Sequence, residues 1–149
     1  MVGTGYKVDS YTFYGAYTRI QENRNPSLKC SQDNDKFKMS NESAKLNYPI
    51  GLILADEVAL AGGKAYYNGA DSPNSNYYLY NTDYYWTFSP SLFVPEDTSV
   101  ELFSVTNKGA IETYTHADNS RGIRPVINLK KEVTISKGDG SSLNPFVIN

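Results

Sequence analysis

The hairpin pattern at residues 99–115 constrains the fold more than any other part of the chain. There the sequence reads "SVELFSVTNKGAIETYT", two runs rich in β-branched and aromatic residues joined by a short polar turn. The turn ends in Gly109, a residue type that readily adopts the positive φ of hairpin turns. The pattern therefore predicts two antiparallel strands in the second half of the chain.

A strand followed by a short helix is predicted at residues 48–63, "YPIGLILADEVALAGG". The apolar run at residues 50–54 predicts the strand, and the alanine-rich stretch after it predicts the helix. Asp56 and Glu57 stand in the first helical turn, where negative charge is favourable. The Gly-Gly pair that follows is a typical helix stop.

Weaker patterns precede this unit. In residues 10–20, apolar and aromatic side chains recur at a spacing that predicts a short amphipathic helix. Residues 21–47 are polar and predict a long loop, with a short strand at residues 28–30.

Further strands are predicted near the C-terminus. Residues 121–129 form one, and Pro125 places it at a sheet edge or puts the proline among its first residues. Residues 133–148 predict two short strands joined around "GDG". Helices early and antiparallel strands late make an α+β fold, which we expect to be a single domain over residues 1–149.

Composition narrows the function. The net charge is -2 and the Lys and Arg residues are scattered, which argues against a nucleic-acid partner. The chain has 13 Tyr, which is typical both of recognition surfaces and of half-exposed strands, and the count alone leaves both interpretations open. A single cysteine, Cys30, excludes a cysteine-rich zinc site.

Catalytic and metal sites find little support in the motifs. His116, the one histidine, lies near Asp118 and Ser120, but polar residues in a loop are usually only a loop, so we expect no enzyme and no catalytic residues. The acidic stretches lack the EF-hand ligand spacing, so we expect no metal site and no cofactor; calcium held by scattered loop oxygens is the alternative. Arg124 is expected to pair with Asp56 or Glu57.

Three segments resemble a known architecture in the order in which they occur. "GLILADEVALAGG" (Gly51–Gly63), "YYWTFSP" (Tyr84–Pro90) and "RGIRPVINL" (Arg121–Leu129) resemble the formylglycine-generating-enzyme-like and C-type-lectin-like fold. More closely, these segments and Tyr14–Phe37 resemble an uncharacterised family of secreted or surface proteins of Firmicutes.

The resemblance implies a location and excludes one chemistry. It implies an extracellular or cell-surface protein of which this chain is the C-terminal portion, with Cys30 separated from its disulfide partner. Enzymes of this fold use late cysteines to activate oxygen through copper, and no cysteine follows Cys30. It also implies that Tyr84–Pro90 is a central strand with Trp86 and Phe88 in the core and Tyr85 nearer the surface. Asp56, Glu57 and Arg124 complete the expected structural set.

In lectin-like domains the ligand lies on long loops, which map here to residues 66–76, 91–98 and 114–121. Their aromatic rings and amides suit a sugar or a protein surface. The candidate binding residues in these loops are Tyr66, Tyr67, Asn68, Asn74, Asn76, Tyr114, His116, Asn119 and Arg121. The leading hypothesis is a noncatalytic binding module for a protein or glycan. The alternative is the structural head domain of a pilin-like or wall-attached protein that self-associates.

Overall fold

The computed structural model describes residues 10–29, 50–65, 74–141 and 143–149 of the chain. This part is a mixed α+β fold, mostly strands with a few short helices, which confirms the fold class at that level. Its helices are α1 (Gly15–Tyr17), the π-helical turn η1 (Thr18–Glu22) and α2 (Ala55–Leu60). Its strands are β1 (Thr12–Phe13), β2 (Ile50–Leu52), β3 (Lys64–Ala65), β4 (Tyr85–Val94), β5 (Ser99–Val105), β6 (Ala110–His116), β7 (Pro125–Ile127), β8 (Ile135–Lys137) and β9 (Val147–Ile148).

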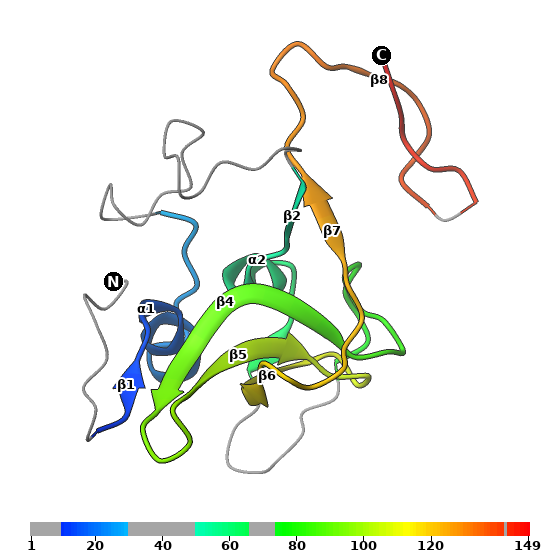
Figure 1. The fold of residues 1–149 in the computed structure, drawn as a ribbon. Helices are drawn as coiled ribbons and strands as arrows, with labels where there is room; N and C mark the ends of the chain where they lie inside the picture. The colour runs from blue at the N-terminus through cyan, green and yellow to red at the C-terminus, as the bar shows by residue number, and fades with distance from the viewer. Residues whose placement is uncertain (1–9, 30–49, 66–73, 142) are drawn as a thin grey trace.

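A five-stranded sheet forms the body of the molecule, in the order β1-β4-β5-β6-β3. All neighbours are antiparallel except β3, which runs parallel to β6. The long strand β4 arches across the sheet, with the helices packed behind it (Figure 1). Between the pairs Trp86↔Ser104 and Leu92↔Glu101, β4 advances six residues while β5 advances three, so β-bulges bend β4 and curl the sheet.

The predicted hairpin and helix are both confirmed. β5 and β6 pair antiparallel, and Gly109 in their turn has a φ of +81°. A side chain at Gly109 would collide with the carbonyl oxygen of Asn74, so only glycine fits there. The α2 helix begins and ends close to the predicted residues, and Gly62 after it has a positive φ. The predicted helix at residues 10–20 is shorter and later, because β1 occupies its first turn.

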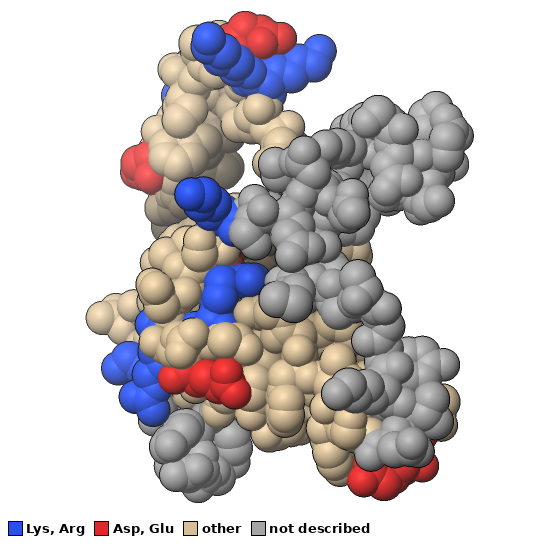
Figure 2. All heavy atoms as spheres, turned by 90° about the vertical axis from the view of Figure 1, so that its left-hand side faces the viewer, with Lys and Arg blue, Asp and Glu red and all other residues tan. Residues whose placement is uncertain are grey.

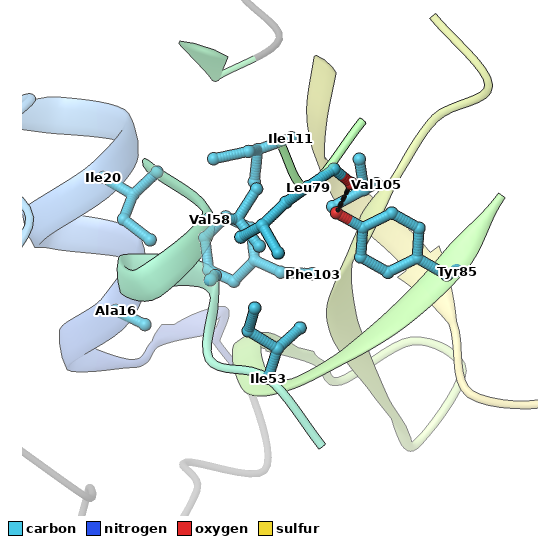
Figure 3. Packing of buried hydrophobic residues seen from close by; sticks show 10 residues of the cluster. Ala16, Ile20, Ile53, Val58, Leu79, Tyr85, Phe103, Val105 and Ile111 are labelled. Atoms are coloured by element: carbon cyan, nitrogen blue, oxygen red, sulfur yellow. Dashed lines mark hydrogen bonds between the residues drawn. The ribbon is translucent and has the colours of Figure 1, made fainter. Parts of the chain in front are cut away.

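The hydrophobic core lies between α1, α2 and one face of the sheet (Figure 3). Phe103 and Val105 of β5 and Ile111 of β6 point into it, together with Val58 of α2. Tyr85 also points into it, and its hydroxyl donates a hydrogen bond of 2.9 Å to the Leu79 carbonyl.

The expected orientation of Tyr84–Pro90 is wrong by one residue. Tyr85 is 2% exposed, Phe88 is 45% exposed, and Trp86 is half-buried. Tyr85, Thr87 and Ser89 are the inward residues, so Trp86 and Phe88 belong to the other face. The inward hydroxyls find partners, Tyr85 on Leu79 and Thr87 on the Phe103 carbonyl at 2.8 Å, which removes the cost of burying them.

Asp56 and Arg124 do not pair with each other. Arg19 donates two hydrogen bonds of 2.8 Å to the Asp56 carboxylate, and the Ser27 amide donates a third. Arg124 instead donates to the Leu79 carbonyl, with its guanidinium carbon 5.1 Å from the centre of the Tyr85 ring. The expected pairing of Arg124 with Asp56 or Glu57 is therefore wrong, because Arg19 already satisfies Asp56. Glu57 accepts from the Leu54 amide at 2.7 Å.

The C-terminal part leaves the body as an arm. β7 pairs antiparallel with β2, with Pro125 as the first residue of its strand, as predicted. Beyond it, β8 and β9 form the predicted hairpin, far from the five-stranded sheet (Figure 1). We call the described residues 128–141 and 143–149 the C-terminal arm.

Candidate functional site

Three aromatic side chains from separate elements meet at one end of the body. The Phe13 and Tyr17 rings lie 4.4 Å apart between centroids, and the Tyr17 hydroxyl lies 3.2 Å from the Tyr114 hydroxyl. Tyr114 is 57% exposed, and Phe13 is also exposed. Burial first, and then the hydrogen bond to Tyr114, raises the pKa of Tyr17 to about 12. We call Phe13, Tyr17 and Tyr114 the aromatic face.

One row of side chains crosses four strands beside this face. Phe13 of β1 lies opposite Leu92 of β4, Leu92 opposite Glu101 of β5, and Glu101 opposite His116 of β6. Directly opposed residues share a face of a sheet, with their Cβ atoms about 5 Å apart. Glu101 alternates with Phe103, so the row lies on the side of the core. The row starts in the aromatic face and ends in a carboxylate and an imidazole.

Glu101 is the unusual member of this row. It is 6% exposed, its Oε2 has no hydrogen-bond partner among the described residues, and its Oε1 lies 3.6 Å from His116 Nε2. That separation is longer than a hydrogen bond. Burial raises the pKa of Glu101, while nearby His116 lowers it and Asp97 raises it further. The carboxylate is therefore poorly satisfied by the surrounding protein.

The described binding candidates do not all lie together. Tyr114 and His116 lie two residues apart on β6, in strand rather than loop; His116 ends the row and Tyr114 lies beside it. Asn119 stabilises the turn that follows β6, because its amide and Nδ2 donate to the His116 carbonyl at 3.0 and 3.2 Å. Because His116 lies opposite Glu101 in the sheet, it faces a residue that the sequence did not single out.

Arg121 belongs to the opposite face of the sheet. Its guanidinium carbon lies 4.5 Å from the centre of the Tyr84 ring, and its Nη2 lies 3.8 Å from Glu112 Oε2. Glu112 lies opposite Ser104, and this pair is on the face of the sheet that points away from the core. Arg121 is thus separated from the aromatic face by the sheet itself.

Asn74 and Asn76 serve the turns around them. The Asn74 amide donates to the Lys108 carbonyl at 2.9 Å and its side chain donates to the Gly62 carbonyl. Asn74 Oδ1 accepts from the Asn76 amide at 3.3 Å. Tyr66, Tyr67 and Asn68 lie outside the described residues. The expected loop at residues 91–98 is also partly wrong, since β4 continues to Val94 and residues 91–94 are buried.

Sequence reasoning missed Phe13, Tyr17 and Glu101. Both aromatics lie in the segment predicted as an amphipathic helix, but Phe13 belongs to β1, and α1 buries Ala16 rather than Tyr17. For Glu101 a signal existed. In the strand "VELFSV" it alternates with Phe103 and Val105, which places a carboxylate on the apolar side.

Comparison with known proteins gave no match, whether with family models, curated proteins or solved structures. In the ranges that the structure describes, no group of three or more His, Cys, Asp or Glu residues is placed to hold a metal ion. No described helix has the length and apolar character of a membrane span.

Proposed function

We propose that this chain is a noncatalytic, extracellular binding module with a C-type-lectin-like fold, which recognises a protein or a glycan through its aromatic face. One observation carries the proposal: Phe13, Tyr17 and Tyr114 come from three elements and meet at the surface. Grouped exposed aromatics on a soluble domain are typical of interaction sites.

The aromatic face is held in place before any ligand arrives. Tyr17 is fixed between the Phe13 ring and the Tyr114 hydroxyl, and the Tyr14 amide next to Phe13 donates to the Ser91 carbonyl at 2.9 Å. A ligand therefore meets rings that have already lost most of their conformational freedom, and this lowers the cost of binding. Flat rings with a polar tip suit the C–H face of a sugar as well as protein side chains.

The test is a glycan array and a peptide array probed with the wild type and with Tyr114→Ala. Tyr78→Ala is the matched control, because Tyr78 is more exposed than Tyr114 and lies outside the face. We expect a set of spots that the wild type and Tyr78→Ala bind and that Tyr114→Ala loses. Equal binding by all three folded proteins would contradict the proposal.

A second candidate function is the structural head of a pilin-like or wall-attached protein. The observation that favours it is the C-terminal arm, which exposes a series of large apolar side chains: Leu129, Ile135, Leu143, Phe146, Val147 and Ile148. Such a surface suits contact with a sister subunit. Sedimentation of the wild type and Phe146→Asp over a range of concentrations tests it: a dimer that only the wild type forms would favour this function.

A further inference from the structure

We propose that the ligand of the aromatic face is a protein and that it places a lysine side chain there, with the lysine ammonium at the Glu101 carboxylate and the lysine stem along the aromatic rings. This inference rests on the proposed function and adds the chemical class of the ligand. It assigns Glu101 as the polar anchor of the site.

The buried Glu101 carboxylate is incompletely compensated by the protein. Burying a charged carboxylate is costly unless hydrogen bonds or an opposite charge compensate it. Among the described residues Glu101 Oε2 has no hydrogen-bond partner, and the ion pair found there for this group is the 3.6 Å contact to His116. A cationic donor supplied by a ligand at the Oε1 side would compensate the charge of the carboxylate.

A ligand can reach the Glu101 carboxylate from the side of His116. The His116 side chain is half-exposed at the end of β6, and its contact with Glu101 is longer than a hydrogen bond. A weakly held imidazole at the surface can turn away at small cost. An incoming ammonium would then take the position beside the carboxylate that the imidazole nitrogen leaves.

Of the two cationic side chains, lysine suits the site better than arginine. Arginine pairs best with carboxylates through a rigid fork to both oxygens, whereas lysine is a compact point charge on a flexible apolar stem. In Glu101, Oε1 faces His116 and Oε2 is enclosed, so the two oxygens do not present an open edge to a fork. The stem of a lysine matches the apolar rings of Phe13 and Tyr17, and its charge is attracted to ring faces.

The surrounding charge also favours a cation. Glu96 and Asp97 are exposed in the turn between β4 and β5, and Asp97 acts on Glu101 electrostatically. Glu96 also raises the pKa of Tyr11, the residue before β1. Acidic side chains gather at the bottom right of Figure 2, at the level where Figure 1 places this turn. This end of the body therefore attracts cations.

The test is an NMR titration of the folded chain with Nα-acetyl-lysine amide and, in parallel, with Nα-acetyl-norleucine amide, which has a similar stem without the charge. The His116 imidazole and the Tyr114 ring are the reporters. We expect saturable shifts of both with the lysine probe and about ten-fold weaker binding of the norleucine probe, as the loss of one charge-assisted hydrogen bond predicts.

Two variants make the result specific. Glu101→Gln keeps the shape and removes the charge, so it should bind the lysine probe about ten-fold more weakly. Glu132→Gln makes the same charge change on the exposed C-terminal arm and should bind as the wild type does. Because burial raises the pKa of Glu101, lysine binding to the wild type should also weaken as the pH falls, and Glu101→Gln, which keeps His116 and Asp97, should lose the part of this dependence that comes from Glu101.

Three results would overturn the inference. Equal affinity for both probes, or unchanged lysine binding by Glu101→Gln, would remove Glu101 as the anchor. Shifts with glucosamine but not with the lysine probe would assign the ammonium to a glycan. If the array still shows spots that depend on Tyr114, the proposed function survives each of these results; if it shows none, the proposed function fails separately.

Discussion

The body and the C-terminal arm use similar residues in opposite ways. In the body, Phe103, Val105 and Ile111 are fully buried between the sheet and the helices. In the arm, Ile135, Phe146 and the residues around them are about half exposed. Apolar content therefore does not decide what forms a core. The body has several layers to pack together, whereas the arm is a two-stranded hairpin, which alone is marginally stable in water.

Local hydrogen bonds give the arm its shape in place of a core. The Asp139 carboxylate accepts from the Ser141 amide at 2.9 Å, and the Asp139 amide donates to the Asn144 carbonyl at 3.1 Å. The Phe146 ring lies against Gly140. The hairpin is thus well formed while its apolar side chains remain at the surface.

A matched pair of truncations tests the difference in stability between the body and the arm and has the largest expected effect. Phe103→Ala should lower the free energy of unfolding by about 4 kcal/mol, because it leaves a cavity in a fully buried site. Phe146 is 53% exposed, so Phe146→Ala should cost less than about 1 kcal/mol. Urea denaturation of the three proteins measures both. Similar costs would show that the arm belongs to the same cooperative core.

The second prediction compares a carboxylate in each region. Asp56→Asn should cost about 3 kcal/mol, since it breaks the pair between the buried Asp56 carboxylate and the partly exposed Arg19 and weakens the bond from Ser27. Asp139→Asn should leave the unfolding midpoint of the body unchanged, because the Asp139 carboxylate accepts from the Ser141 amide, within the hairpin. Thermal unfolding followed by circular dichroism separates the two. A large shift for Asp139→Asn would contradict the assigned independence of the arm.

A smaller effect tests the inward orientation of Tyr85. Tyr85→Phe removes the hydroxyl that donates to the Leu79 carbonyl and should cost about 1 kcal/mol. Tyr78→Phe, at an exposed position, should cost almost nothing. If Tyr85→Phe is equally neutral in urea denaturation, the Tyr85 hydroxyl is not buried against Leu79.

The smallest effect is the pH dependence that comes from Glu101. Its pKa is raised in the folded state, so the folded protein holds this proton more tightly than the unfolded chain does. The resulting stabilisation is complete below the ordinary value of 4.5 and is lost as the pH rises through the folded pKa. Glu101→Gln should therefore be more stable than the wild type at pH 7, with the difference shrinking toward pH 4. A difference that grows toward acid would reverse the assigned sign.

Much of the fold could be predicted because its signals are local. The hairpin at residues 99–115, the α2 helix and the C-terminal hairpin each carry their own turn or stop residues. The side of β4 that faces the core could not be predicted in this way. Alternation gives the period of a strand but not its phase, and the contacts that hold Tyr85 inward, such as the Leu79 carbonyl and Arg124, come from other segments.

The candidate site was less accessible from the sequence. Tyr114 and His116 were singled out as candidate binding residues, but their neighbours in the fold come from distant segments. Phe13 joins them through β1, and Glu101 through the register of β5 with β6. Register and bulges depend on tertiary packing, so no single segment contains the information.

Array binding by matched variants decides whether the aromatic face or the C-terminal arm is the recognition surface. The glycan and peptide arrays would be probed side by side with the wild type, Tyr114→Ala and Phe146→Ala, each first shown to be folded. We predict that Tyr114→Ala loses the bound spots and that Phe146→Ala keeps them. The opposite result, with binding lost only in Phe146→Ala, would contradict the proposed role of the aromatic face and assign ligand binding to the arm.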